Sequence, residues 1–183
     1  KEARAEYQLL LEDQPANADI VATIGLLSLQ LNEFATAETW LKRGLELKYR
    51  DPDSLRFYLG QACEEGKRYD EASAQIKQAL DIKPDWEAGA LFNAQMLQQR
   101  DSNANAIEYM QQFLRSYPKA REVRASYARL LINNKQLKEA RAEYQLLLED
   151  QPANADIVAT IGLLSLQLNE FATAETWLKR GLE

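Results

Sequence analysis

Residues 53–86 have the sequence DSLRFYLGQACEEGKRYDEASAQIKQALDIKPDW, and this stretch decides the fold. Apolar or small residues recur in it at spacings of three, four and seven on both sides of a turn at Gly66-Lys67-Arg68. Asp51-Pro52 supplies a helix N-cap and a first-turn proline, and Lys83-Pro84-Asp85 ends the second helix. Because no strand-like alternation is present, the stretch predicts two antiparallel helices.

The stretch is one unit of a degenerate repeat that continues along the chain. An alanine recurs every 34 or 35 residues, and a second small residue stands twelve positions before most of these alanines. The alanines are Ala3, Ala37, Ala72, Ala106, Ala140 and Ala174, and the second series is Gly25, Gly60, Ala94, Ala128 and Gly162. Small side chains let helices approach closely, so we expect the second series to face the alanines across each pair. One pair cannot bury its own apolar flank, so successive pairs must stack.

A longer repeat is superimposed on the short one. Residues 1–46 recur without any change at 138–183, an offset of 137 residues that corresponds to four short periods. Natural repeats diverge until only the structural positions remain alike. Such identity therefore indicates a recent duplication, deliberate engineering or crystallographic repetition of one end of the chain.

The spacing of these residues resembles the tetratricopeptide repeat (TPR), whose pattern runs Leu-Gly, an aromatic, Ala, an aromatic or aliphatic residue, Ala and Pro. The clearest match is Leu59-Gly60, Tyr69, Ala72, Ile76, Ala79 and Pro84. The unit from 87 to 120 departs from the pattern at Asn93, Asn103 and Phe113, and we expect a local distortion there. The resemblance identifies the chain as a fragment of a longer bacterial TPR protein.

The resemblance implies an all-α fold, a right-handed α-solenoid of antiparallel helix pairs with about eleven helices. Residues 1–183 are expected to form a single solenoid that opens with the second helix of a partial repeat. The predicted boundaries are 1–17 for the partial repeat, 18–52, 53–86, 87–120 and 121–154 for full repeats, and 155–183 for a truncated one.

The composition excludes several classes of function. The chain has a formal net charge of −6, no histidine and a single cysteine, Cys63. Without histidine it lacks the commonest general base and metal ligand, and one cysteine cannot form an internal disulfide. We therefore predict no catalysis, no metal site and no cofactor. The acidic balance argues against nucleic-acid binding, and no apolar run is long enough for this fragment to insert in a membrane.

In the family, the first helix of each repeat lines a concave groove in which partners bind. The resemblance therefore implies that this chain binds a peptide or protein segment in such a groove. The residues at the matching positions are Phe57, Gln61, Glu64, Leu91, Gln95, Gln98, Arg129 and Asn133. Phe57 and Leu91 would anchor apolar side chains of the partner, and the glutamines would bind its backbone. Alternatively, Phe57 and Leu91 pack between adjacent repeats and the glutamines are simply solvated.

Both ends of the array are predicted to be adhesive, because each exposes an apolar face meant for a neighbouring helix. The residues predicted for end-to-end contact are Tyr7, Leu10 and Leu11 at one end and Trp177, Leu178 and Leu182 at the other. Unlike ends that meet head to tail propagate as an open filament unless the rotation closes. We therefore expect concentration-dependent self-association.

Three hypotheses for the function follow. The first is a non-catalytic scaffold that binds a protein or peptide segment. The second is the recruiting arm of a larger enzyme or envelope assembly factor, and the third is an engineered or crystallographic array that assembles head to tail with itself. The chain starts with neither methionine nor a signal peptide, so it is expected to be a piece of a longer protein whose compartment, cytoplasm or periplasm, it does not indicate.

Overall fold

Helices account for all the regular structure in residues 2–181, which are the residues that the computed structural model describes. The eleven helices are α1 (Glu2–Asp13), α2 (Ala18–Gln30), α3 (Phe34–Glu46), α4 (Pro52–Glu65), α5 (Tyr69–Ile82), α6 (Glu87–Arg100), α7 (Asn103–Ser116), α8 (Arg121–Asn133), α9 (Leu137–Asp150), α10 (Ala155–Gln167) and α11 (Phe171–Arg180). The predicted all-α class and number of helices are confirmed. None of the eleven described helices combines the length and the apolar character that crossing a membrane requires.

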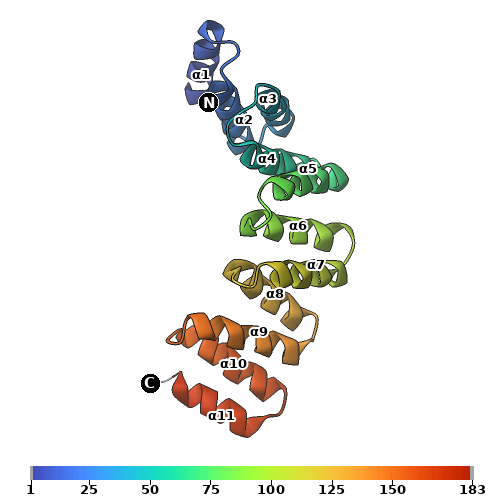
Figure 1. Ribbon diagram of the computed structural model, residues 1–183, viewed down its shortest axis with the longest axis vertical. Helices are drawn as coiled ribbons and strands as arrows, with labels where there is room; N and C mark the ends of the chain where they lie inside the picture. The colour runs from blue at the N-terminus through green and yellow to red at the C-terminus, as the bar shows by residue number, and fades with distance from the viewer. Residues whose placement is uncertain (1, 182–183) are drawn as a thin grey trace. The chain divides into compact units, whose positions relative to one another are not determined.

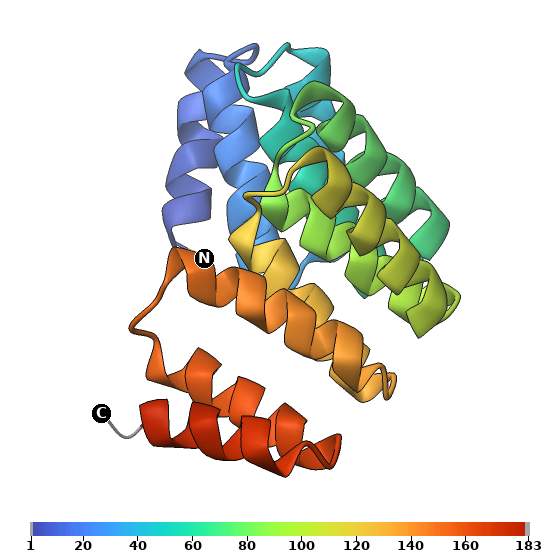
Figure 2. The same cartoon turned by 60° about the horizontal axis from the view of Figure 1, so that its bottom comes forward.

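The chain divides into two compact units, Lys1–Met96 and Leu97–Glu183, and the division falls within α6. In the first unit α2 packs against α3 and α4 against α5, and α3 packs in turn against α4 (Figure 1). In the second unit α8 packs against α9 and α10 against α11, and α9 also packs against α10 (Figure 2). Each unit is therefore built from stacked helix pairs. The repeat boundaries and the right-handed course of the whole chain stay predictions.

Local start signals mark where some of the helices begin. The side-chain oxygen of Asn17 accepts hydrogen bonds from the backbone N–H groups of Asp19 and Ile20, which otherwise have no partner in the first turn of α2. Pro52 stands at the start of α4, where the N–H that proline lacks is not needed by the helix. An asparagine just before a helix and a proline in its first turn are both helix-start signals that can be recognised in the sequence.

The turns within the pairs are tight, and one of them differs from the rest. Asn32 and Lys67 adopt left-handed backbone conformations, with φ of 58° and 57°, in the turns after α2 and α4. Only Asp101 and Ser102 separate α6 from α7, and the Ser102 side chain caps α7 by accepting from a backbone N–H. The unit from 87 to 120, for which we expect a distortion, therefore has a shorter turn than its neighbours.

The alanines that recur every 34 or 35 residues, here called the registered alanines, are buried in the described helix pairs, as predicted. Ala37, Ala72, Ala106, Ala140 and Ala174 are all 0% exposed. Cys63 is buried beside Ala72 and Ile76, so it faces the second helix of its own pair, α5, and packs as a small apolar residue.

The nearest contacts of the glycines are not the alanine side chains that the spacing paired with them. A Cβ built on Gly25 would lie 2.9 Å from Cδ2 of Leu41. One on Gly60 would lie 2.9 Å from Cδ1 of Ile76, with a backbone oxygen of Ala72 at 3.4 Å. The space that a glycine leaves on the first helix is thus filled by a branched aliphatic side chain, four residues after the alanine of the second helix. The two helices do approach closely, but the residue opposite each of these glycines is a large aliphatic one.

Ion pairs join successive helix pairs at one repeated position, with both polarities. Arg4 of α1 binds Glu33, which precedes α3. Glu38 of α3 binds Arg68, which precedes α5, so the acid and the base have exchanged places. In each case one partner directly follows a registered alanine and the other precedes the next alanine by four residues. The second copy of the duplicated segment repeats the first pair as Arg141 with Glu170.

The pair of Glu38 and Arg68 is well shielded on the acidic side. The side chain of Glu38 is 13% exposed, and the Arg68 guanidinium, helped by Lys42, holds its pKa at about 2 rather than 4.5. Because folding lowers this pKa, the pair stabilises the fold fully above about pH 4.5 and loses that effect as the pH falls toward 2. The partial exposure of Arg68 limits the contribution to about 1 kcal/mol.

We predict that Gly25→Ala lowers the free energy of unfolding by about 1 kcal/mol, although it removes a glycine from a helix. The new methyl group would collide with Cγ of Leu41 at 3.0 Å and with its backbone nitrogen at 3.2 Å, and the backbone cannot move aside. Urea denaturation measures the change. The matched control is Gly181→Ala, whose Cβ meets nothing closer than 3.5 Å. A Gly25→Ala chain as stable as wild type would contradict the packing described here.

We predict that Arg68→Glu destabilises the chain by about 1 kcal/mol and that adding Glu38→Arg restores at least half of this loss. The double variant reproduces the polarity of Arg4 and Glu33, and a further Lys42→Gln matches the glutamine at the equivalent position in α1. The measurement is the unfolding midpoint in urea at neutral pH. If the double variant is no more stable than Arg68→Glu alone, the ion pair is not the source of the effect.

Candidate functional site

Five of the eight predicted groove residues lie on two helices of the first unit. Phe57, Gln61 and Glu64 are on α4, and Leu91 and Gln95 are on α6. The structure brings one residue of each helix together, because Nε2 of Gln95 donates to Oε1 of Glu64 at 3.1 Å. Gln95 is exposed, so its amide is accessible beside a carboxylate. We call Gln61, Glu64, Leu91 and Gln95 the first-helix face.

Phe57 belongs to an aromatic cluster at the junction of two repeats. It is half-buried, and its ring centroid lies 5.0 Å from that of Trp86 and 5.4 Å from that of Phe92. A third ring, that of Tyr58, lies 5.7 Å away. Such contacts each stabilise packing by roughly 1 kcal/mol. Phe57 of α4 therefore packs against Trp86 and against Phe92 of α6, and only its exposed part remains for a partner.

The other three predicted groove residues lie in the second unit and are exposed. Nε2 of Gln98 donates to Oδ1 of Asn103 at 3.2 Å, across the short turn after α6. Arg129 donates from Nε to the carbonyl oxygen of Ala125 in its own helix at 3.3 Å. Asn133 is the last residue of α8. Arg129 is thus placed to offer the rest of its guanidinium to an acidic group.

The α1 residues predicted for end-to-end contact differ in exposure. Leu11 is buried and Tyr7 packs beside it against the apolar side of α2, so both serve the fold. Leu10 is exposed, and so is Leu9, which the sequence analysis did not single out. At the other end Trp177 and Leu178 are half-buried, and Leu182 lies outside the described residues. The end-to-end contact stays a prediction.

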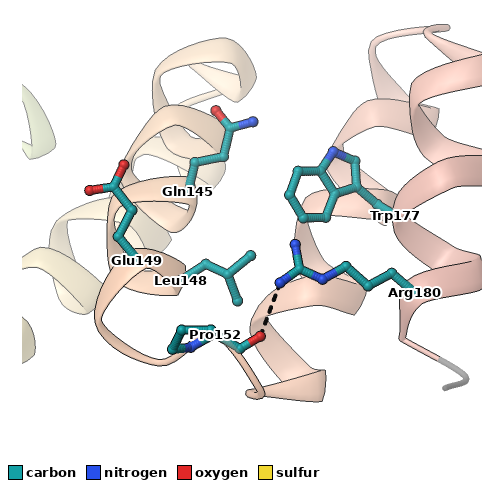
Figure 3. Close-up of a pocket in the computed structure, with 6 residues that line it drawn as sticks. All are labelled: Gln145, Leu148, Glu149, Pro152, Trp177 and Arg180. Atoms are coloured by element: carbon teal, nitrogen blue, oxygen red, sulfur yellow. Dashed lines mark hydrogen bonds between the residues drawn. The ribbon is translucent and has the colours of Figure 1, made fainter.

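A hollow of about 460 Å³ lies between α9 and α11 in the second unit (Figure 3). It is lined by Gln145, Leu148 and Glu149 of α9, by Pro152, and by Trp177 and Arg180 of α11. The Arg180 guanidinium lies 5.3 Å from the Trp177 ring centroid and donates to the carbonyl oxygen of Pro152 at 3.1 Å. The walls of the hollow therefore include an aromatic ring and a guanidinium that a backbone carbonyl holds in place.

The duplicated segment reproduces this arrangement in the first unit. Arg43 donates to the carbonyl oxygen of Pro15 at 2.8 Å and lies 5.4 Å from the Trp40 ring centroid. Periodicity places both tryptophans on a second helix but gives no reason to pair them with an arginine. The only feature of the sequence that could have indicated these contacts is the identical spacing of Pro, Trp and Arg in both copies.

One cluster in the first unit has the residue types of a metal site. A carboxylate oxygen of Glu38, one of Glu71 and Sγ of Cys63 lie within 4.8 Å of one another. However, Arg68 already donates to Glu38 and is paired with Glu71 at 3.3 Å, so a guanidinium supplies the positive charge. Burial raises the pKa of the Cys63 thiol, which keeps it protonated and a poor ligand. The donor set does not fit a metal ion.

The sequence comparisons agree with the helix-pair architecture. Two sequence models described as tetratricopeptide repeat match this chain, one over residues 46–85 and the other over residues 97–160. Cellulose synthase operon protein C of Pseudomonas fluorescens (strain SBW25) is 30% identical over 184 residues. That alignment covers 96% of this chain but only 14% of the relative, so the chain spans about one seventh of that protein's length.

Solved structures share the fold at low sequence identity. The C-terminal part of a TPR repeat-containing protein from Cytophaga hutchinsonii matches with a TM-score of 0.81 at 14% identity, covering 99% of this chain and 72% of that one. YrrB, described as a TPR protein with an unusual peptide-binding site, matches with a TM-score of 0.62 at 19% identity, covering 96% of this chain and 90% of that one. At identities this low, the structural matches show a common fold and nothing more specific.

Proposed function

We propose that this chain, which belongs to the tetratricopeptide repeat family, is a non-catalytic scaffold that holds a peptide or protein segment against its first-helix face. The observation that carries the proposal is the contact between Glu64 of α4 and Gln95 of α6. In this contact a carboxylate of α4 and an amide of α6 lie side by side, and the half-buried Leu91 precedes Gln95 by four residues, about one helical turn, on α6. Binding of an extended segment needs hydrogen-bond donors and acceptors for its backbone and an apolar contact for its side chains.

The polar groups of this face suit a polypeptide backbone. The exposed amide of Gln95 can accept from a backbone N–H, and Gln61, one helical turn before Glu64, can donate to a backbone carbonyl. In the second unit, Arg129 would bind an acidic side chain of the partner and Asn133 would contribute a further amide. YrrB, which has the same fold, is described as binding peptides, and this supports the proposal in general terms.

We further propose that the chain is a recruiting segment of a longer protein that serves an envelope assembly. The similarity to cellulose synthase operon protein C supports this role. In that setting any catalysis would reside in the proteins that the scaffold holds. The alternative, a self-assembling array, draws its support from the exposed leucines of α1 and from the duplicated segment.

We predict that Glu64→Ala together with Gln95→Ala weakens capture of a polypeptide partner by about fivefold or more. The test places a photoactivated crosslinking residue at position 98, next to the first-helix face, in the wild-type and doubly substituted chains. Crosslinked polypeptides from a cellulose-producing Pseudomonas are then quantified by mass spectrometry.

The matched control is Gln78→Ala, which removes another exposed glutamine, from α5. This variant should capture the same partners as the wild-type chain. Equal capture by the wild-type and doubly substituted chains would show that the first-helix face is not the binding site.

A further inference from the structure

Three arginines of this chain hold the carbonyl oxygen of a proline in the turn before a helix. The pairs are Arg43 with Pro15 at 2.8 Å, Arg124 with Pro118 at 2.7 Å and Arg180 with Pro152 at 3.1 Å. Arg124 reaches its carbonyl from the helix that follows the turn, α8, and the other two reach theirs from α3 and α11, the second helix after the turn. A guanidinium has five N–H donors, so each arginine keeps donors for a further partner.

For one of these arginines the further partner is part of the chain. The other terminal nitrogen of Arg124 binds the carboxylate of Glu143, which stands three residues after the registered alanine of α9. The two side chains are only 12% and 20% exposed, so the ion pair is largely shielded from water. The chain thus shows which group a guanidinium held by such a carbonyl takes as its second partner, namely a carboxylate.

The other two arginines lack that carboxylate. The position of Glu143 is occupied by Trp40 in α3 and by Trp177 in α11, each again three residues after a registered alanine. The guanidinium of Arg43 lies 5.4 Å from the first ring centroid, and that of Arg180 lies 5.3 Å from the second. Neither arginine forms an ion pair with an acidic side chain among residues 2–181. Two guanidiniums are therefore held beside an indole with no carboxylate of the described chain to neutralise them.

The hollow between α9 and α11 has walls that fit such a carboxylate. One terminal nitrogen of Arg180 is bound to Pro152, and the other points into the space between Leu148 and Trp177 (Figure 3). The hollow of about 460 Å³ is large enough for one side chain, and Leu148 and Trp177 offer apolar surface to its carbon stem. Glu149 also lines the hollow, and its charge limits the affinity for an anion.

The arrangement is a property of these residues and not of the helices around them. Trp40 lies on a helix, α3, that packs against the following helix, α4. Trp177 faces α9, which packs against the preceding helix, α8. The two copies therefore have different neighbours, yet the arginine, the ring and the proline carbonyl have the same arrangement in both.

We infer that Arg180 and Trp177 form a binding site for a carboxylate, and that the ligand is an acidic side chain of a partner polypeptide. The carboxylate accepts from Arg180 as Glu143 accepts from Arg124, and its carbon stem lies against Trp177 and Leu148. Because Arg180 is exposed, this contact alone is weak, and the neighbouring residues of a polypeptide supply the affinity that a free carboxylic acid lacks.

Arg43 and Trp40 form the same site in the first unit. Both sites are separate from the first-helix face, since they lie on α3 and on α9 and α11 rather than on α4 and α6.

The test follows the indole N–H signals of the isotope-labelled 183-residue chain by NMR spectroscopy. The chain has three tryptophans, so Trp40 and Trp177 report on the two sites and Trp86 reports on non-specific effects. The probe is the acetylated and amidated peptide Gly-Glu-Leu-Glu-Gly, and its neutral match is Gly-Gln-Leu-Gln-Gly. We expect the acidic peptide to shift the signals of Trp40 and Trp177 with a dissociation constant of about 1 mM, and the neutral peptide to bind at least about fivefold more weakly.

Substitutions assign the response to the arginines. Arg180→Gln should remove the shift of Trp177 and leave that of Trp40 unchanged, and Arg43→Gln should do the reverse. Each site is thus the matched control for the other, and the site that still responds shows that the chain remains folded. Glu149→Gln should strengthen binding at Trp177 by about twofold, because it removes a like charge from the hollow.

Several results would overturn the inference. One is an acidic peptide that shifts neither Trp40 nor Trp177 at concentrations up to about 10 mM. Another is a neutral peptide that binds as tightly as the acidic one, and a third is a shift of Trp177 that survives Arg180→Gln. The last concerns the neutral peptide with a free terminal carboxylate. If this peptide binds as tightly as the acidic one, the site reads a chain terminus and not an acidic side chain.

Discussion

A small residue at the crossing of each helix pair, glycine in three pairs and alanine in the other two, is the constraint on which the rest of this structure depends. Gly25, Gly60 and Gly162 leave a space on the first helix, and Leu41, Ile76 and Leu178 of the second helix fill it. The resulting close approach fixes how far apart the two helices lie and which of their residues point away from each other. Those outward residues, among them Leu26 and Leu29, are apolar, so a further helix that covers them stabilises the pair.

The neighbouring helix, not the local sequence, therefore decides what becomes surface. The duplicated segment demonstrates this within one chain, since the same leucines are partly buried beneath α4 in one copy and exposed in the other. The ion pairs favour one order of the stacked repeats over others. Arg4 with Glu33 and Glu38 with Arg68 occupy the same structural position with opposite polarity, so a repeat placed out of sequence would bring like charges together.

The sequence predicted the elements of this fold well and their contacts less well. Periodicity identified eleven helices and the buried alanines, because it reports which side of a helix is covered. It does not report what covers that side, and so it did not show that Leu41 and Ile76 fill the space at the glycines. The ion pairs join residues 29 and 30 positions apart with reversing charge, so no recurrent charge pattern revealed them. For Phe57 the sequence left two roles open, and the rings of Trp86 and Phe92 show that it packs.

The central claim is that stacking neighbours alone make the two copies different, and hydrogen exchange tests it most directly. Peptic fragments from 18–44 and 155–181 have the same sequence, hence the same mass and the same intrinsic exchange rates. After one labelling time, the account predicts two superimposed isotopic envelopes for each shared fragment, the slower from the copy that α4 covers. A single envelope, as narrow as that of a fragment occurring once in the chain, would contradict it.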